Sequence, residues 1–293
     1  MIGPGAISLR ATGRGRRRLL VNRVAEGSAV LAAVLAVAVL AVVIWSVGSR
    51  GIGAISRDFF VRGPSSDFFG GKGGIAPALA GSLLLVGVAT LIALPMGVLT
   101  AIFVSEFAPG RAAQQIRLWL DVLNGFPSIV IGIFVFTFIS RQSAFAGGSA
   151  LAIIMLPLVA RSTMEVLRLV PMELRDASYA LGVSKWQTVI RVVLPTSFGG
   201  ILTGTTLAIA RAAGETAPLL FTCAIAGQTV DWNPSHSVQS IPLTIFNYSE
   251  SADPALHEQA WAAALVLILF VLVTSLTARL LLERSRRRLG LQR

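Results

Sequence analysis

Residues 200–221, with the sequence GILTGTTLAIARAAGETAPLLF, form an apolar stretch that contains only two charged side chains, Arg211 and Glu215. About 20 such residues are enough to cross the hydrocarbon core of a bilayer as a helix. A charge near the centre of such a helix costs at least ~2.5 kcal/mol to insert, so it usually faces a partner, a water-filled cavity or a substrate path. We interpret this stretch as a membrane span in which Arg211 contacts an anion.

The composition of the 293-residue chain indicates that most of it lies in a membrane. Hydrophobic residues make up 54% of the chain, charged residues only 13%, and the mean hydropathy is +0.75. Soluble domains are less apolar and about twice as rich in charge. The sequence predicts an all-α, polytopic membrane protein with six transmembrane helices, near residues 29–48, 81–104, 122–140, 149–167, 200–222 and 260–282.

Arginine clusters predict the orientation, because basic residues are concentrated in loops on the cytoplasmic side. One cluster precedes the first span, at residues 14–23, and another follows the last span, at residues 284–293. Six spans place both termini on one side, so we expect a multi-pass protein of a bacterial inner membrane with both termini in the cytoplasm. The net charge of +11 also suits nucleic-acid binding, but each cluster adjoins a span, where lipid headgroups are the expected contact.

The residues that most catalytic and metal sites require are scarce. Cys223 is the only cysteine, which excludes an internal disulfide and a cysteine-based metal site. His236 and His257 are 21 residues apart in the sequence, so we interpret them as surface residues and predict no metal site. Residues 70–74, GGKGG, lack the spacing and the hydroxyl of a phosphate-binding P-loop. No span holds a nucleophile with a base, so we expect neither an enzyme nor an ATPase.

The segment 171–195 carries the turn and capping residues of two short helices joined by a glycine. Pro171 favours a helix start, and Gly182 suits a helix end in the left-handed region. Ser184 and Gln187 have the spacing of a capping box, and we expect Pro195 to end the segment. A DNA-reading helix-turn-helix is the alternative, but spans tether this pair at both ends. We therefore expect it to contact a cytoplasmic partner through its apolar side chains Leu174, Leu181 and Trp186.

The same segment resembles the EAA signature of binding-protein-dependent ABC importer permeases, E-A-A-x-x-x-G followed by I-x-L-P. Asp176-Ala177-Ser178 with Gly182, and Val192-Val-Leu194-Pro195, match it approximately. The resemblance implies the fold of an ABC type I importer permease and a loop received by two ATPase subunits, which bind ATP and Mg, so that this chain holds no cofactor. Its coupling contacts are then expected from Arg175, Asp176, Ala177, Ala180, Leu181, Gly182, Lys185 and Trp186.

Residues 210–222 resemble the permeases of phosphate importers of the PstA type, whereas sulfate and molybdate permeases share only the core A-R-A-x-G-E. Residues 126–132, 241–248 and 256–264 resemble the same permeases. The resemblance implies phosphate as substrate, a PstC-like second permease, PstB-like ATPases and a PstS-like extracytoplasmic phosphate-binding protein. Another oxyanion is the alternative; an ion-coupled secondary transporter should show an internal repeat, and none is found. We divide the chain into a basic tail, the first span with its outer loop, the permease domain and a second basic tail, at residues 1–27, 28–76, 77–283 and 284–293.

Substrate contact is expected at Arg211, since a guanidinium matches the charge and geometry of phosphate. We expect Glu215 to pair with Arg211 when substrate is absent, and Gly214, Thr216 and Pro218 to loosen the helix there. The alternative is that the two charges only satisfy one another. Small residues at four-residue steps predict close helix packing, which we expect against the second permease, at Gly200, Gly204 and Ala208. Glu106, Asp121 and Glu165 lie near span ends, where headgroups or loops would solvate them, so we expect structural roles for them.

Overall fold

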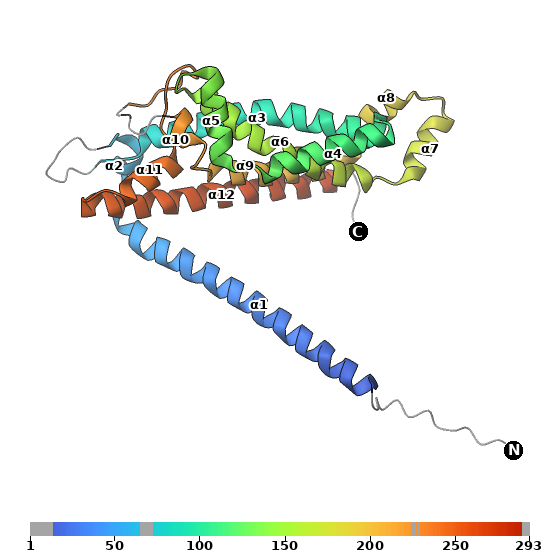
Figure 1. Ribbon diagram of the computed structural model, residues 1–293, viewed down its shortest axis with the longest axis horizontal. Coiled ribbons are helices and arrows are strands. Elements are labelled where there is room, and N and C mark those ends of the chain that lie inside the picture. The colour runs from blue at the N-terminus through green and yellow to red at the C-terminus, as the bar shows by residue number, and fades with distance from the viewer. Residues whose placement is uncertain (1–13, 65–72, 224–226, 228, 289–293) are drawn as a thin grey trace. The chain divides into compact units, whose positions relative to one another are not determined.

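The structure is a computed structural model that describes residues 14–64, 73–223, 227 and 229–288 (Figure 1). The sequence around Lys72, the first thirteen residues and the last five lie outside the described residues. Every regular element among the described residues is helical, which confirms the all-α prediction. The α-helices are α1 Arg14–Gly51, α2 Arg57–Val61, α3 Ala76–Ile102, α4 Gly110–Gly125, α5 Ser128–Ile139, α6 Ala144–Arg168, α7 Met172–Ala180, α8 Lys185–Thr188, α9 Leu194–Ala213, α10 Leu219–Thr222, α11 Ile241–Ser249 and α12 Pro254–Arg288.

Five helical segments are long and apolar enough to cross a membrane, and a bent pair makes a sixth if it is counted as one span. The pair is α4 with α5, which meet at 99°. Phe126 and Pro127 separate the two helices, and both have extended backbones. Proline disfavours helical dihedrals at the residue before it, which accounts for Phe126. The span expected over residues 122–140 is therefore not a single helix, because the chain turns sharply between α4 and α5. The five segments are Leu20–Ala54, Ala76–Phe107, Ala144–Arg168, Lys185–Ala213 and Pro254–Thr277.

The chain divides into two compact units, residues 1–49 and residues 50–293. The first unit consists mainly of α1, whose residues from Leu20 to Ile44 are predominantly apolar. An 18-residue window within this helix is strongly hydrophobic, with a mean hydropathy of 2.9. A helix that is apolar all round is typical of a membrane span.

Helix α6 is the centre of the second unit, where α3, α9 and α5 pack around it (Figure 1). Small residues allow the closest approach: a Cβ added at Gly97 of α3 would lie 2.8 Å from Cγ1 of Val159. Apolar side chains from α3, α6 and α9 fill the core between them, among them Leu85, Ala89, Ala93, Leu151, Met155, Val159, Ala208 and Ala212. Lipid chains are as apolar as these side chains, so close van der Waals packing between the helices, and not removal of apolar surface from water, stabilises the bundle.

The small residues of α9 lie against α6 of the same chain. A Cβ added at Gly200 would lie 2.5 Å from Cγ1 of Val166, and one at Gly204 would lie 2.2 Å from Oγ of Ser162. Ala208 continues this face and is buried in the core. This face therefore packs closely against α6 of the same chain, whereas the expected contact with a second permease stays a prediction. Spacing along one helix identifies a small-residue face without identifying the helix that covers it.

Two segments distant in sequence close the amino-terminal end of α6. Ser143 accepts a hydrogen bond at Oγ from the backbone N–H of Ala146. The carbonyls of Pro234 and His236 accept from the N–H groups of Phe145 and Ala144, both at 2.8 Å. These bonds satisfy donors that a helix start leaves free. They also fix the loop segment 234–236 against the start of α6.

Candidate functional site

The span that begins at Lys185 stops at Ala213, in the middle of the segment with the two charges. The backbone N–H of Gly214 donates to the carbonyl of Arg211, at 3.1 Å, and that of Glu215 donates to the carbonyl of Ala212, at 3.2 Å. Both bonds join residues three apart and close the helix end. The expected span over 200–222 therefore extends too far at its carboxyl-terminal end, and a break separates α9 from the four-residue helix α10.

Arg211 and Glu215 approach one another across this break. Nε of Arg211 lies 3.6 Å from Oε1 of Glu215, which is an ion-pair distance but too long for a hydrogen bond. The Arg211 side chain is 52% exposed and that of Glu215 is 19% exposed. The pair is therefore loose, and the guanidinium keeps N–H donors available to another group. Arginine on the amino-terminal side of the acid is also the weaker order for a pair at this spacing.

The break is held by α5, a contact that sequence reasoning missed. A Cβ added at Gly132 would lie 2.6 Å from both Cα and O of Pro218, so the two backbones touch. Thr222 donates from Oγ1 to the carbonyl of Pro218, at 2.9 Å, and the carbonyl of Thr216 accepts from Leu219 N–H, at 3.1 Å. The only sign of this contact in the sequence was a glycine within an apolar stretch, because a glycine lets another backbone approach closely.

The segment 171–195 begins as the sequence predicts. Pro171 precedes the first residue of α7, and Gly182 has φ +75°, a left-handed conformation that suits glycine. The capping box at Ser184 and Gln187 is present: the Ser184 N–H donates to Oε1 of Gln187, at 3.3 Å. The turn between Gly182 and Ser184 therefore ends α7 and begins α8.

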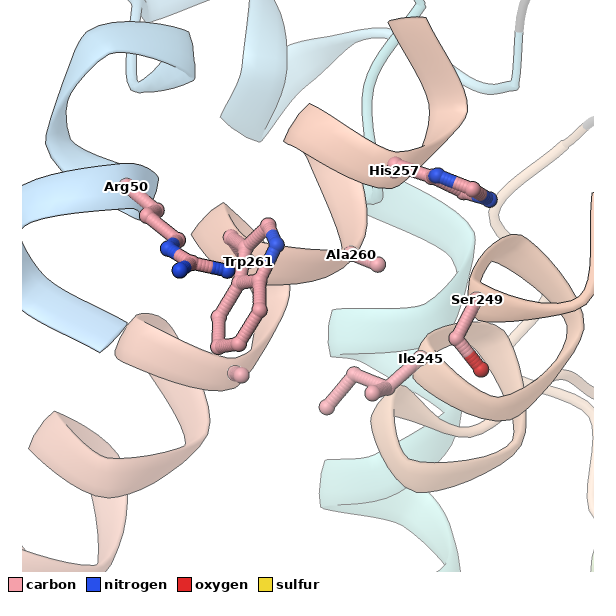
Figure 2. A pocket seen from close by; sticks show the side chains of 7 residues that line it. Arg50, Ile245, Ser249, His257, Ala260 and Trp261 are labelled. Atoms are coloured by element: carbon pink, nitrogen blue, oxygen red, sulfur yellow. The ribbon is translucent and has the colours of Figure 1, made fainter. Parts of the chain in front are cut away.

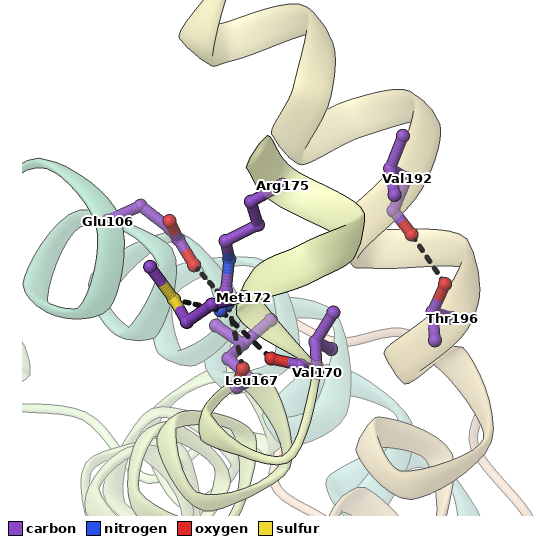
Figure 3. Close-up of polar contacts among 7 residues, drawn as sticks. All are labelled: Glu106, Leu167, Val170, Met172, Arg175, Val192 and Thr196. Atoms are coloured by element: carbon purple, nitrogen blue, oxygen red, sulfur yellow. Dashed lines mark hydrogen bonds and ion pairs between the residues drawn. The ribbon is translucent and has the colours of Figure 1, made fainter. Parts of the chain in front are cut away.

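The carboxyl-terminal part of this segment differs from the prediction. Pro195 does not end the loop, because α8 continues through a π-helical turn, Val189–Val193, into α9. Proline has no N–H for the helical ladder, and the wider π turn directly before it accommodates the disruption. Thr196 donates from Oγ1 to the carbonyl of Val192, at 2.7 Å (Figure 3). One helical stretch, Lys185–Ala213, therefore connects α7 to the break near Arg211.

The exposed surface of α7 and α8 carries apolar side chains. Leu181 is 82% exposed and Trp186 is 57% exposed, and Leu174 is exposed as well. Large exposed apolar residues grouped together mark an interaction surface. Most of the predicted coupling residues are exposed on this pair of helices: Asp176, Ala177, Ala180, Leu181, Gly182, Lys185 and Trp186.

Arg175 is the exception among the predicted coupling residues, because it faces inward and is only 8% exposed. Its Nη2 donates to Oε1 of Glu106, at 2.8 Å, and to the carbonyl of Leu167, at 2.9 Å, while Nη1 donates to the carbonyl of Val170, at 3.0 Å (Figure 3). The Glu106 side chain is 8% exposed, so the expectation that loops or headgroups solvate it is also wrong. Arg175 therefore joins α7 to the ends of two spans instead of presenting a surface charge.

A second bond inside the loop joins its two helices. Ser178 of α7 and Thr188 of α8 are both buried, and their hydroxyl oxygens lie 2.9 Å apart. Small polar residues at these positions let the two helices approach closely. This contact therefore joins α7 to the start of the long helical stretch.

A charged cluster lies where α4 crosses α6. Arg161 of α6 forms an ion pair with Asp121 of α4. Both residues border a cavity of about 190 Å³ together with Arg117, Glu165 and Arg168. Sequence reasoning assigned Asp121 a structural role at a span end but did not identify Arg161 as its partner, because the two residues belong to different helices.

The opposite end of the second unit carries another cavity, of about 390 Å³, shown in Figure 2. The guanidinium of Arg50 lies 4.9 Å from the centre of the Trp261 ring, a cation–π contact. Ile245, Ser249 and His257 line the same space. Arginine and tryptophan are common at membrane–water interfaces, which agrees with a position at a span end.

The two histidines lie at the surface, as the sequence predicts. Nδ1 of His236 is 2.6 Å from Oδ2 of Asp231, and Nε2 of His257 is 2.7 Å from the carbonyl of Ser251. The Asn233 N–H donates to Asp231 at 2.8 Å. This bond, and secondarily the one with His236, holds the pKa of Asp231 below its ordinary value. Across the described ranges, no group of three metal-ligating side chains converges.

Comparisons with known proteins agree with one another. The family model described as "Binding-protein-dependent transport system inner membrane component" matches residues 93–289. The phosphate transport system permease protein PstA of Haemophilus influenzae is 37% identical over 90% of this chain and 95% of its own length. PstA 1 of Mycobacterium tuberculosis is 39% identical over 94% of this chain and 92% of its own length.

Solved structures share the fold at low identity. A chain of a bacterial alginate ABC transporter, in complex with an alginate-bound periplasmic protein, aligns with a TM-score of 0.62 and 14% identity, over 94% of this chain and 98% of that chain. A chain of the inward-facing MetNI methionine ABC transporter aligns with a TM-score of 0.56 and 17% identity, over 72% of this chain and 94% of that chain. Both agree with the expected fold of an ABC type I importer permease.

Proposed function

The chain belongs to the family of binding-protein-dependent transport system inner membrane components, and from this membership we propose how its helix break and its exposed loop work together in import. It is a permease subunit of a phosphate ABC importer and not an enzyme, as its relatives over at least 90% of its length indicate. The phosphate path, the coupling contacts and the specific partners are our proposals.

We propose four partners around this subunit. A PstC-like permease completes the phosphate path, two PstB-like ATPases bind ATP and Mg and receive α7 and α8, and a PstS-like protein delivers phosphate on the outer side. The exposed apolar residues Leu181 and Trp186 support the ATPase contact. Both termini and the α7–α8 pair then lie on the cytoplasmic side of the inner membrane, as the arginine clusters indicate.

Arg211 is the residue that contacts phosphate along the path in this proposal. The observation that carries it is the loose Arg211–Glu215 pair at the end of α9, with the arginine half exposed within an otherwise apolar stretch. Dehydrated phosphate needs several N–H donors, and a guanidinium supplies up to five in a planar fork. Glu215 compensates the charge of Arg211 when phosphate is absent and is displaced when phosphate binds.

The coupling route runs along one helical stretch. Movement of α7 reaches α8 through the Ser178–Thr188 contact, and α8 is continuous with α9 up to Ala213. The Arg175–Glu106 pair carries the same movement to the end of α3. ATP-driven closure of the ATPases therefore changes the position of the break that holds Arg211. This route gives the π-helical turn at Val189–Val193 a role as the place where the stretch can adjust.

The experiment that tests the substrate is uptake of labelled phosphate by cells that lack this chain, with and without the wild-type chain restored. We expect the wild type to restore uptake that a large excess of sulfate or molybdate does not reduce. Restored uptake of sulfate or molybdate in place of phosphate would identify another oxyanion as substrate and refute the phosphate assignment.

A further inference from the structure

Trp232 lies exposed in the segment that leads from α10 to α11. Its side chain is 58% exposed, and Val230 beside it is exposed as well. Tryptophan is enriched among the few residues that carry most of the binding energy of a protein interface. An exposed tryptophan outside the helices therefore raises the question of which partner it contacts.

The turn formed by residues 231–236 holds Trp232 in one arrangement. The Asn233 N–H donates to Oδ1 of Asp231, at 2.8 Å, and the Ser235 N–H donates to Oδ1 of Asn233, at 3.0 Å. The His236 N–H donates to the carbonyl of Asn233, at 3.0 Å. A surface that is ordered before binding loses less conformational entropy when a partner binds. The turn thus presents Trp232 with little further ordering required.

The same turn is hydrogen-bonded to the elements that form the helix break. The carbonyl of His236 accepts from the first turn of α6, and the Ser143 N–H, at the start of α6, donates to the carbonyl of Thr222 in α10, at 3.0 Å. Thr222 bonds in turn to the carbonyl of Pro218. Helix α6 has 25 residues and is therefore about 37 Å long at 1.5 Å per residue. The turn lies at its start, and α7 and α8 lie at the opposite end of the second unit (Figure 1).

The charge of this part of the chain favours a protein as the partner of Trp232. Residues 223–259 contain four carboxylates and no lysine or arginine, although the whole chain has a net charge of +11. Anionic lipid headgroups attract basic segments and repel acidic ones. A protein surface with basic residues is attracted to an acidic segment, which speeds encounter and excludes wrong partners. The four carboxylates are those of Asp231, Glu250, Asp253 and Glu258.

We propose that the turn 231–236 is the docking site of the extracytoplasmic phosphate-binding protein, with Trp232 inserted into an apolar pocket that basic residues of that protein surround. This inference rests on the proposed function, from which it takes the partner that delivers phosphate. Docking at this turn places the released phosphate beside the break that holds Arg211, at the end of the second unit away from the ATPase contacts.

The first test measures binding of the phosphate-loaded binding protein to the complete transporter complex in nanodiscs. Trp232→Ala should weaken binding at least about tenfold and leave assembly of the complex unchanged, because the side chain is exposed. Phe60→Ala is the matched control, since Phe60 is an exposed aromatic residue of α2, outside the turn. Wild-type affinity in Trp232→Ala overturns the proposal, and so does equal weakening in Phe60→Ala.

The second test identifies the neighbour of position 232 directly. A photo-reactive phenylalanine analogue at this position should crosslink to the binding protein in the assembled complex. Crosslinks to lipid alone would overturn the proposal and make Trp232 a membrane-surface contact, and crosslinks to the second permease alone would overturn it as well.

Uptake of labelled phosphate by the wild-type complex separates the docking site from the proposed function. A wild-type complex that neither binds the phosphate-binding protein nor imports phosphate refutes the proposed function itself. Normal wild-type binding and import, with binding unaffected in Trp232→Ala, refutes only the docking site.

Discussion

Arg175 and Glu106 lie 69 positions apart in the sequence, yet they form a 2.8 Å ion pair that both spans and loop keep away from solvent. The pair fixes α7 to the end of α3, while the opposite side of α7 exposes Leu174 and Leu181. A loop with one anchored face and one free apolar face can receive a partner and transmit its movement. Most of the predictions below concern such contacts between elements distant in sequence.

Removal of the Arg175 charge should uncouple ATP hydrolysis from transport. Arg175→Met leaves Glu106 buried without a partner, and loss of one member of a buried pair typically costs about 3–5 kcal/mol. We expect α7 to detach, so that ATPase activity no longer responds to the phosphate-binding protein. The measurement is ATPase stimulation in proteoliposomes, with the exposed Arg191→Gln as control. Normal stimulation in Arg175→Met would show that the anchor is not needed.

A methyl group at Gly132 should displace the break that holds Arg211. Gly132→Ala places Cβ within 2.6 Å of Pro218, and overpacking of this kind costs about 1–3 kcal/mol. We expect a lower melting temperature of the complex and reduced phosphate uptake. Gly87→Ala is the matched control, since a Cβ there meets nothing within 4 Å. Equal effects of the two substitutions would mean that the α5 contact does not position the break.

Larger side chains on the small-residue face of α9 should separate it from α6. Gly204→Val adds bulk where even a Cβ would lie 2.2 Å from Oγ of Ser162, so we expect a loss of about 1–3 kcal/mol of stability. Because this face meets α6 of the same chain, the defect should be present before the second permease binds. The measurement is protease resistance of the chain expressed alone. A defect seen only in the assembled complex would place the face at the subunit interface instead.

The loop that contains Asp231 should keep its hydrogen bonds until the solution is strongly acidic. The pKa of Asp231 is lowered in the folded chain by the Asn233 N–H and by His236. A lowered carboxylate pKa stabilises the fold fully above the unfolded value, and this contribution is lost as pH falls through the folded value. We expect exchange protection of the Asn233 amide to hold down to about pH 4, the ordinary range of aspartate, and to fall only below it. Asp231→Asn should lower this protection and remove its dependence on pH; an unchanged profile in that variant would disprove the assignment.

Local features of the fold were predictable from sequence because neighbouring residues determine them. The left-handed turn at Gly182 and the capping box at Ser184 follow from residues within a few positions of each other. The helix break was also predictable from Gly214 and Pro218. The span was nevertheless expected to continue to residue 222, whereas it ends at Ala213. The apolar surface of α7 and α8 was predictable for the same reason.

Contacts between elements were not predictable from one sequence. Periodicity showed that Gly200 and Gly204 share a face of α9, but not that Val166 and Ser162 of α6 cover it. Arg175 was grouped with predicted coupling residues that are otherwise exposed, and only its distant partner Glu106 explains why it turns inward. Residues that are charged and close to a span end give the same sequence pattern whether they are solvated or paired.

The exposed Arg211 guanidinium is the central element of the proposed path, and its charge and shape can be separated by substitution. The decisive measurement compares phosphate uptake by assembled complexes that carry wild-type chain, Arg211→Lys or Arg211→Gln. We expect Arg211→Gln to assemble normally and to transport essentially no phosphate, and Arg211→Lys to retain partial uptake, because a lysine keeps the charge but lacks the planar fork. Wild-type uptake by an assembled Arg211→Gln complex would contradict the proposal and leave the Arg211–Glu215 pair a purely structural contact.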